Sequence, residues 1–424
     1  MSAAASTLAP PGIGPLLDEE IRRFRHDTPA AARRIHLNNA GAALPPQSVL
    51  DAVLDHLRRE AEIGGYEAAD EAEERIAAVY GDVAALLGAG PGNPRNIALV
   101  ENATVGFAQA LSAFRFRPGD LLVTTESDYP SNMLMYAALV ERFGIEIRRA
   151  ADRPGGGVDP DSVAALARDP RCRLVAVSWV PTSSGLVQDV EAVGEVCAAA
   201  GVPYLIDACQ AVGQLPIDVA RLRCDYLAAA ARKFLRGPRG IGFLYVSDAA
   251  LARGDYPLGI DMAGATLRAD GRLDLVATAR RFENWEFGYA LVLGLGEAAR
   301  YARAAGIERI GARASEHAAY LRERLAGLPG ITIADRGERL CAIVTAEVTG
   351  RSGRPGQGQA PREIVQALRP AGINLHAIGA LRGDGTVRPL LRISPHYYNT
   401  REELDTALLA LEELLASGGR EPRA

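Results

Sequence analysis

Short apolar segments alternate with amphipathic helical stretches from about residue 80 to residue 247, and this alternation limits the possible folds more than any other feature. The expected strands are 97–100, 121–125, 146–149, 173–180, 204–207, 226–229 and 242–246. Strands that are apolar throughout and are separated by helices are typical of a parallel sheet buried on both faces. We therefore predict an α/β fold with a mainly parallel, seven-stranded sheet covered by helices.

The pattern changes after about residue 288. Two long helices are expected at 289–304 and 307–328, followed by strands at 331–334 and 341–348. A Gly/Pro-rich stretch at 349–361 indicates an exposed loop, and helices at 362–368 and 401–415 complete the chain. We predict a large domain at 36–288 and a smaller α+β domain formed by 1–35 and 289–424.

Composition excludes several classes of function. The net charge is −5, with no basic block of the kind that binds nucleic acid, and no apolar run is long enough to span a membrane. The five cysteines are scattered without a CxxC pair, and the six histidines lie far apart, so neither set predicts a disulfide framework or a metal site. The first 17 residues lack Lys and Arg and make a poor signal peptide, which predicts a cytoplasmic protein.

Lys233 is the only lysine, against 46 arginines. An amine can lose its proton and condense with a carbonyl to form a Schiff base, whereas a guanidinium cannot. Asp207 ends the expected strand 204–207, and Lys233 follows 26 positions later, just after the strand 226–229. Strand ends in such sheets form the ligand sites, and a buried carboxylate needs a cationic partner, for which a pyridinium nitrogen is suited. The two residues therefore predict a site for a pyridine aldehyde.

A third strand end carries Glu101, Asn102, Ala103 and Thr104, at the start of a helix expected from residue 105. Backbone amides and a hydroxyl at a helix start suit a phosphate dianion. Asn102 or Thr104 could equally be a simple N-cap, so this segment alone leaves both readings open.

Residues 207–210 (DACQ) and 232–238 (RKFLRGP) together resemble the class V aminotransferase-fold enzymes. This group uses pyridoxal phosphate (PLP) and includes cysteine desulfurases, kynureninase, isopenicillin N epimerase and the hercynylcysteine sulfoxide lyases. The resemblance extends from residues 35–41 (IHLNNAG) to 391–394 (LRIS) and 398–400 (YNT), and is closest to the sulfoxide lyase branch. It implies PLP fold type I.

The resemblance also implies roles for individual residues. Lys233 would hold the cofactor and move the substrate α-proton, and Asp207 would pair with the pyridine nitrogen. Gln210 would lie near the phenolic oxygen of the cofactor, while Ala103 and Thr104 would hold its phosphate.

Three further cofactor contacts follow from departures from the family pattern. Tyr129 stands where desulfurases have a histidine that stacks on the cofactor ring, and its flat ring can cover a pyridine. Arg232 precedes the lysine, where its guanidinium would take over phosphate charge otherwise bound by a hydroxyl. Thr182 would replace an asparagine that contacts the phenolic oxygen.

The substrate side is also implied by the resemblance. Arg392 would grip the substrate α-carboxylate, for which a bidentate guanidinium is well shaped. Asn38, Ala40 and Gly41 would line the mouth of the site. The substrate is then a small molecule, an L-amino acid. The family fold implies a homodimer with its sites near the interface, where residues around 282–286 would reach the partner's cofactor.

The reaction is predicted from an absence. Desulfurases carry a cysteine on a mobile loop shortly before the carboxylate-binding arginine, and the corresponding stretch 375–385 contains none. We therefore expect a lyase that performs β-elimination at a Cβ–S bond of a cysteine conjugate or sulfoxide, and not a persulfide-forming cysteine desulfurase. A transaminase is the alternative, an epimerase ranks third, and a non-catalytic regulator would be expected to lack the Lys, Asp or Arg.

Overall fold

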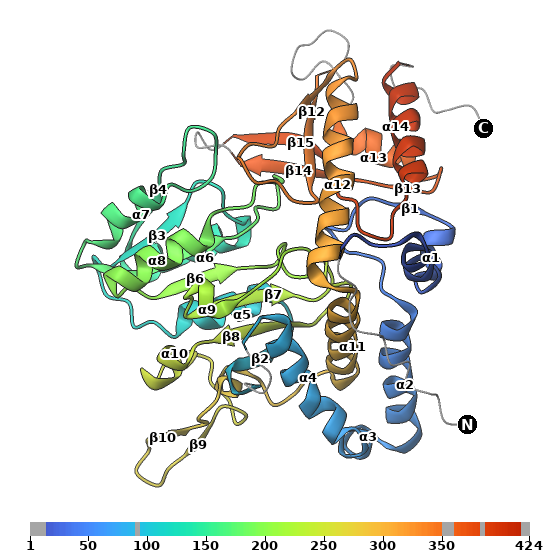
Figure 1. Cartoon of the computed structure of the whole chain (residues 1–424). Coiled ribbons are helices and arrows are strands. Elements are labelled where there is room, and N and C mark those ends of the chain that lie inside the picture. Colours follow the sequence, from blue (N-terminus) through green and yellow to red (C-terminus); the bar gives the residue numbers. More distant parts are fainter. Residues whose placement is uncertain (1–13, 90–93, 350–359, 382–385, 417–424) are drawn as a thin grey trace.

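A seven-stranded sheet forms the centre of the computed structural model, which describes residues 14–89, 94–349, 360–381 and 386–416 (Figure 1). In spatial order its strands are β2 (Ile97–Val100), β8 (Gly242–Val246), β7 (Tyr226–Ala230), β6 (Tyr204–Asp207), β5 (Cys172–Ser178), β3 (Leu121–Thr125) and β4 (Glu146–Ala150). All neighbours are parallel except β8, which runs antiparallel to both β2 and β7. The predicted α/β fold with a mainly parallel sheet is confirmed.

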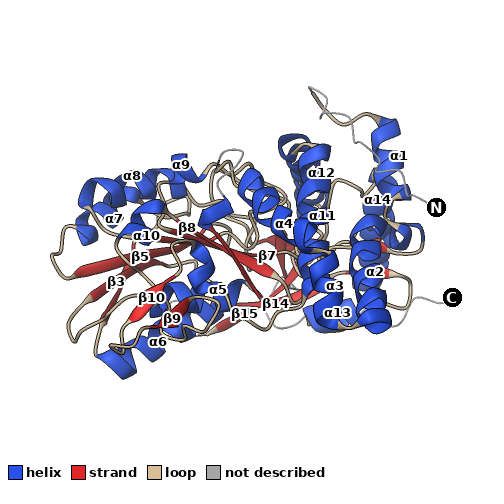
Figure 2. Ribbon diagram, turned by 90° about the horizontal axis from the view of Figure 1, so that it is seen from below, coloured by secondary structure: helices blue, strands red, loops and turns tan. Residues whose placement is uncertain are grey.

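Helices cover both faces of this sheet (Figure 2). One face carries α7 (Pro160–Ala167), α8 (Val190–Ala200) and α9 (Val219–Leu222), and the other carries α5 (Ala103–Ser112) and α6 (Pro130–Phe143). Along β5, Val175 and Val177 belong to one buried cluster and Leu174 and Ala176 to the other. Side chains alternate between the faces of a strand, so a strand covered on both sides is apolar throughout, as the sequence pattern indicated.

A second, four-stranded antiparallel sheet lies beside the first (Figure 1). Its order is β11 (Ile331–Ile333), β12 (Val344–Val348), β15 (Val387–Ile393) and β14 (His376–Leu381). It shares a third core with α12 (Ile307–Ala326), α13 (Pro361–Leu368) and α14 (Arg401–Ala416). Strand β12 begins three residues later than predicted, and the predicted loop 349–361 lies almost wholly outside the described residues. The division into two domains at residue 288 stays a prediction.

Helices at the edge of the large sheet link the two parts. Helix α11 (Tyr289–Ala305) packs against α2 (Gln47–Ile63) and α4 (Glu73–Leu86), with α3 (Gly65–Glu71) between the latter two in the chain. Several further elements are short: α10 (Asp248–Ala252), the 3-10 turns η1 (Pro29–Ala32), η2 (Pro94–Asn96) and η3 (Ala279–Phe282), and an exposed hairpin of β9 (Ala265–Leu267) and β10 (Leu273–Leu275). None of α2, α3, α4 or the hairpin was specified from the sequence.

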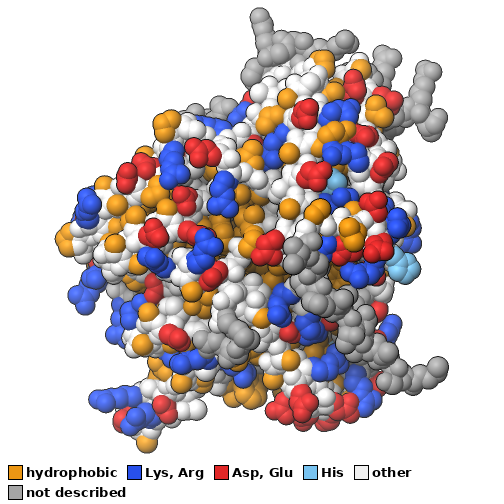
Figure 3. Space-filling view, in the orientation of Figure 1, with side chains coloured by type: hydrophobic (Ala, Val, Ile, Leu, Met, Phe, Trp, Pro, Cys, Tyr) orange, Lys and Arg blue, Asp and Glu red, His pale blue; other side chains and the backbone are white. Residues whose placement is uncertain are grey.

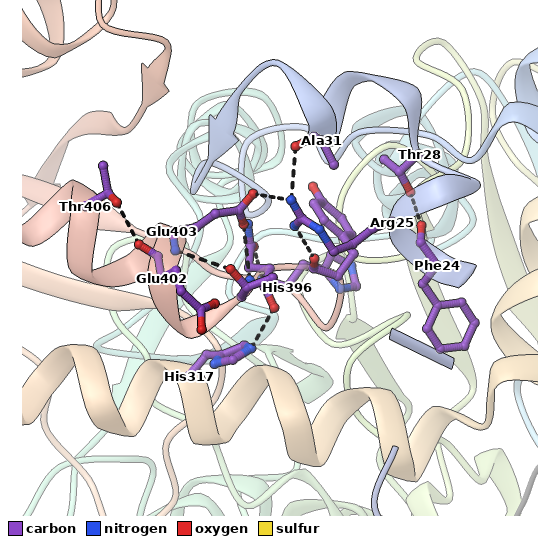
Figure 4. Close-up of polar contacts among 12 residues, drawn as sticks. Phe24, Arg25, Thr28, Ala31, His317, His396, Glu402, Glu403 and Thr406 are labelled. Carbon is purple, nitrogen blue, oxygen red and sulfur yellow. Dashed lines mark hydrogen bonds and ion pairs between the residues drawn. The ribbon is translucent and has the colours of Figure 1, made fainter. Parts of the chain in front are cut away.

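The segment before residue 45 is held against the C-terminal part of the chain. Helix α1 (Asp18–His26) presents Arg25, which donates to Glu403 at 2.8 Å and to the carbonyl of Ala31 at 3.2 Å (Figure 4). Strand β1 (Ile35–His36) then pairs in parallel with β13 (Ile373–Asn374). Residues 38–43 continue from β1: Asn38 forms a parallel bridge with Ser394, and the Ala43 N–H donates to the carbonyl of Arg232 at 2.9 Å.

The surface viewed in Figure 3 intersperses acidic and basic side chains, in keeping with the modest net charge of −5. Among the residues that the structure describes, no helix is long and apolar enough to cross a membrane.

Candidate active site

A cavity of about 270 Å³ opens at the carboxyl ends of β6 and β7. Six of the eight residues predicted to contact the cofactor line it, all except Gln210 and Thr182: Ala103, Thr104, Tyr129, Asp207, Arg232 and Lys233. It is completed by Glu101, Asn102, Asn132, Cys209, Ala230, Arg239 and Gly240. The residues come from four separate strand ends, so it is the sheet that brings them together.

Asp207 and Lys233 reach this cavity from neighbouring strands. Asp207 is the last residue of β6 and lies opposite Ala228 in the ladder with β7, whose turn then carries Lys233. Gly213 has a positive φ of 90°, and a Cβ built on it would lie 2.3 Å from the carbonyl carbon of Phe234. Only glycine allows the segment after β6 to approach the lysine turn this closely.

The Asp207 carboxylate is 8% exposed and accepts two hydrogen bonds. Oδ2 accepts from the Asn132 amide at 3.0 Å, and Oδ1 accepts from the backbone N–H of Cys209 at 3.0 Å. Burial raises the pKa of Asp207, and the positive charge of Lys233 acts in the opposite direction. A cationic ring nitrogen beside the carboxylate would add a second positive charge and favour its ionised form.

The polar network that positions Asp207 was not predicted from the sequence. Asn132 also donates to Asp128 at 3.1 Å, and Asp128 accepts from Ser178 Oγ at 2.6 Å and from Tyr136 Oη at 3.0 Å. Asp128 and Asn132 are four residues apart, with Pro130 at the first position of α6 between them. That spacing places both on one side of the helix start and was the available signal.

Tyr129 directly precedes α6 and faces the lysine. The Lys233 amine lies 5.8 Å from the centre of the Tyr129 ring. Tyr129 therefore lies across the cavity from the amine, and its role as the residue that stacks on the cofactor stays a prediction.

The start of α5 supplies groups for an anion. Asn102 caps the helix by accepting from the N–H of Val105 at 3.1 Å, while no described residue accepts from the N–H groups of Ala103 and Thr104. Gly242 allows this helix start to lie close, since a Cβ there would be 2.4 Å from the carbonyl oxygen of Ala229 and 3.2 Å from the nitrogen of Ala103. Two free backbone donors beside the Arg232 and Arg239 of the same cavity are suited to a phosphate.

This donor set fits pyridoxal phosphate. The cavity offers an amine for the aldehyde, a buried carboxylate for the ring nitrogen, and free backbone donors with two guanidinium groups for the phosphate. Among the described residues, no group of His, Cys, Asp and Glu could hold a metal ion.

Arg392 lies on β15 and is 2% exposed. One terminal nitrogen donates to the carbonyl oxygen and the hydroxyl of Thr182, at 3.1 and 2.9 Å, and the other donates to Asn38 Oδ1 at 3.3 Å. Its Nε has no hydrogen-bond partner, and no described carboxylate forms an ion pair with it. Burial lowers the pKa of Arg392 to about 10, with a further contribution from Arg232. A substrate carboxylate would supply the missing counter-charge.

The other residues predicted for the substrate mouth are joined by hydrogen bonds. Gln210 donates to the carbonyl of Ala40 at 3.0 Å and to the Thr182 hydroxyl at 3.3 Å, and its Oε1 is buried with no hydrogen-bond partner among the described residues. Arg232 donates to the carbonyl of Gly41. Thr182 therefore connects Gln210 with Arg392, a position that the sequence did not indicate. The cofactor and substrate roles of these residues stay predictions.

Comparison with known proteins places this site in a family. The family model "Aminotransferase class-V" matches residues 35–407. A probable cysteine desulfurase of Mycolicibacterium paratuberculosis is 29% identical over 91% of this chain, which spans 56% of that protein. A cysteine desulfurase of Serratia proteamaculans is 29% identical over 93% of this chain and 98% of its own length. The predicted resemblance to class V enzymes is thereby confirmed.

Solved structures agree on the fold. The apo structure of a cysteine desulfurase from Thermococcus onnurineus NA1 has a TM-score of 0.83 at 24% identity, covering 95% of this chain and 99% of that one. The cystine C-S lyase C-DES, in complex with its product cysteine persulfide, has a TM-score of 0.79 at 25% identity, covering 93% of this chain and 100% of the other. The predicted PLP fold type I is confirmed, and so is pyridoxal phosphate as the cofactor.

The predicted reaction is wrong. We expected a β-eliminating lyase distinct from the cysteine desulfurases, yet the relatives that match nearly the whole chain are named cysteine desulfurases. The prediction relied on the absence of a cysteine from 375–385, which assumes that sulfur can leave only through a thiol in that loop. The lysine, aspartate and arginine to which the resemblance assigns the chemistry are all present, and Cys209 lines the cavity. An absent loop cysteine therefore cannot exclude desulfuration.

Proposed function

This chain belongs to the aminotransferase class-V family, and we propose that it is a PLP-dependent enzyme that cleaves the C–S bond of cysteine or of an L-amino acid derived from it, as cysteine desulfurases do. Two kinds of relative support the choice of bond: desulfurases that match along nearly their full length, and a structural neighbour named as a cystine C-S lyase. An amino-acid substrate is supported by one observation: the Arg392 guanidinium is buried and has no described carboxylate partner.

Different residues of the cavity would bind different parts of the cofactor. Lys233 would hold the aldehyde, Asp207 the ring nitrogen, and the first backbone N–H groups of α5 with Arg232 and Arg239 the phosphate. When bound, PLP withdraws electrons from the bonds around the substrate α-carbon. Asn132 and the Cys209 N–H fix the Asp207 carboxylate in one orientation.

On the substrate side, Arg392 orients the α-carboxylate while the Lys233 amine takes the proton from the α-carbon. Thr182 and Asn38 hold the guanidinium in place, so the carboxylate is bound in one direction relative to Lys233. Fixed orientation of the reacting groups is a large part of enzymatic rate enhancement.

The overall transfer is balanced when a thiol receives the sulfur. The Cβ–S bond of cysteine breaks, the sulfur forms an S–S bond with the acceptor thiol, and the Cβ atom gains a proton to give alanine. No oxidant or reductant is consumed, since cysteine plus a thiol equals alanine plus a persulfide.

Product analysis tests the proposal. PLP-loaded protein is incubated with L-cysteine or L-cystine and an excess of a small thiol, with no oxo acid added. We expect sulfur release over many turnovers, with alanine formed from cysteine in equal amount. Pyruvate and ammonia in place of alanine would identify elimination, and conversion of the cofactor to its amine form once per site, followed by arrest, would identify a transaminase. Both outcomes contradict desulfuration.

Assembly and location are part of the same proposal. We propose a cytoplasmic homodimer whose interface includes the exposed apolar side chains near the β9–β10 hairpin. Met262, Leu267 and Trp285 are 67, 75 and 55% exposed, respectively, which is a large apolar area for a free surface. Sedimentation would show a dimer, and Trp285→Asp would shift it toward the monomer.

A further inference from the structure

A second carboxylate, that of Asp128, lies one side chain away from Asp207. Five groups donate to it: the hydroxyls of Thr124, Ser178 and Tyr136 at 2.7, 2.6 and 3.0 Å, the backbone N–H of Tyr129 at 2.6 Å, and the Asn132 amide at 3.1 Å. The three hydroxyl groups belong to buried residues of β3, β5 and α6. An ionised carboxylate only accepts hydrogen bonds, so this set of donors matches the charged form of Asp128.

Asn132 joins the two carboxylates. Its amide nitrogen donates to Asp128 Oδ1 at 3.1 Å and to Asp207 Oδ2 at 3.0 Å, and the residue is 1% exposed. An amide nitrogen has two N–H groups, and here each carboxylate accepts from that one nitrogen. No more than two hydrogen-bond lengths therefore separate the two carboxylates, with a buried amide between them.

The charge and the amide have opposite effects on the proton affinity of Asp207. The negative charge of Asp128 acts to raise the pKa of Asp207, whereas the hydrogen bond from Asn132 acts to lower it. A like charge nearby favours the protonated form, and a hydrogen bond donated to the carboxylate favours the ionised form. Because two different residues carry the two effects, substitutions can separate them.

The proton concerned is the one that the Asp207 carboxylate would share with the ring nitrogen of PLP. The ring withdraws electrons most strongly when that nitrogen is protonated. We propose that Asp128 is a positioning residue whose negative charge, acting across Asn132 and Asp207, keeps the ring nitrogen of bound PLP protonated. The proposal rests on PLP as the cofactor and does not depend on which substrate bond is cleaved.

Other charged and titratable groups surround these residues. In the cofactor cavity they are Glu101, Tyr129, Cys209, Arg232, Lys233 and Arg239. In a second cavity of about 240 Å³, which Asp128 also lines, they are Glu126, Arg149, Asp152, Arg336 and Arg388. Tyr136 of α6 completes the set. All of them stay in place in the variants below, so a difference between variants comes from the substituted residue.

Nitrogen NMR of protein loaded with PLP that carries ¹⁵N in its ring observes this proton directly, without substrate or turnover. The chemical shift of the ring nitrogen is followed from pH 6 to pH 10 in native protein and in Asp128→Asn. We expect the variant to lose the ring proton at a pH about one to two units lower, because the like charge is gone. The same pH dependence in both proteins, including a proton that both retain up to pH 10, would overturn the proposal.

Asn132→Leu separates the charge from the geometry. This variant removes the hydrogen bond that favours ionised Asp207 and leaves the charge of Asp128 in place. The ring proton should therefore be lost at the same pH as in native protein or at a higher one. If the two residues only held Asp207 in position, both variants would lose the proton at a lower pH, and that result would contradict a role for the charge.

Asp120→Asn is the matched control. Asp120 precedes β3 as Asp128 follows it, is 7% exposed, and pairs with Arg173 at 3.0 Å. This variant should keep the native pH dependence, and a shift as large as that of Asp128→Asn would overturn the proposal. If Asp128→Asn does not fold, Asp128→Ser removes the same charge and carries the same prediction. Since no substrate is present, either result leaves the proposed C–S cleavage to its own test.

Discussion

Two buried arginines, Arg236 and Arg392, lie in surroundings that differ in one respect. Both are 2% exposed, and neither forms an ion pair with a described carboxylate. Arg236 is surrounded by partners, whereas the Nε of Arg392 has no hydrogen-bond partner in the described part of the chain. The difference separates a residue that holds the fold together from one that is available to a ligand.

The surroundings of Arg236 are closed. Its guanidinium donates to the carbonyl of Leu44 at 2.8 Å, to the Tyr397 hydroxyl at 2.5 Å and to the Thr28 hydroxyl. The rings of Tyr397 and Tyr398 lie 5.2 and 4.6 Å from it, within the range of cation–π attraction. Burial acts to lower the pKa of Arg236, but its tyrosine neighbours more than offset this, and the pKa is raised.

The surroundings of Arg392 are open by comparison. Burial lowers its pKa to about 10, so the charged form is disfavoured in the structure as it stands. A carboxylate ligand would remove this penalty. Burial alone therefore does not mark a functional arginine, whereas burial with a missing partner does.

The largest effect is expected on turnover, from a change at Lys233. Lys233→Ala removes the group that holds the cofactor and moves the α-proton, and turnover should fall by about 10⁴-fold or more. The free energy of unfolding should change little. Borohydride reduction of native PLP-loaded protein, followed by peptide mapping, should tag the peptide that contains Lys233. A tag on any other peptide would contradict the assignment.

The largest effect on the free energy of unfolding is expected from a change at Arg236. Arg236→Met leaves the Leu44 carbonyl without its donor and removes the cation from its ring partners, at a cost of about 3 kcal/mol in the free energy of unfolding. Urea titration measures this, with the exposed Arg95→Met as the matched control. If Arg236→Met were as stable as the control, the closed cluster would not stabilise the fold.

A pH effect of similar or smaller size on the free energy of unfolding is expected from His317. His317 is buried on α12, its Nε2 lies 3.0 Å from the carbonyl oxygen of Asn399, and burial lowers the pKa of His317 to about 4 (Figure 4). The unfolded chain takes up a proton near pH 6.5, and the folded one does not until about pH 4. The stability that is present above pH 6.5 is therefore lost as the pH falls toward 4, by about 2–3 kcal/mol.

His317→Gln should reduce that loss, because glutamine does not titrate. The free energy of unfolding of both proteins is compared at pH 7.5 and pH 4.5. An identical loss in the two proteins would show that His317 is not responsible.

The sequence predicted strands of the large sheet more fully than those of the small sheet. Strands β2, β3, β6 and β8 have the predicted bounds, because strands buried on both faces are apolar throughout. Strands β14 and β15 were not assigned, since Gly379 and Pro389 interrupt any simple pattern. The β9–β10 hairpin is exposed, and its three-residue strands leave too short a pattern to read.

The site, like the fold, was predicted in part from the sequence. Lys233 and Asp207 were found because a lone lysine and a strand-end carboxylate are unusual where they stand. Asn132 and Asp128 were missed because polar residues at a helix start usually cap it. The contact between Thr182 and Arg392 joins residues 210 positions apart, and only the packing of the two sheets brings them together.

The smallest expected effect is that of Arg392→Gln on the free energy of unfolding. Arg392→Gln removes a buried charge that lacks a described counter-ion, so the free energy of unfolding should stay unchanged or rise by up to about 1 kcal/mol. Urea titration beside Arg236→Met would measure the contrast between the two arginines. A large loss of stability in Arg392→Gln would mean that Arg392 is a structural residue like Arg236.

The most direct measurement is the affinity of the PLP-loaded protein for L-alanine and for L-alaninamide, which differ only in the charge of the group that Arg392 should hold. We predict that native protein binds alanine about 10- to 100-fold more tightly, and that Arg392→Gln binds the two equally. Equal binding by the native protein, or a preference that survives in Arg392→Gln, would contradict an amino-acid carboxylate site at Arg392.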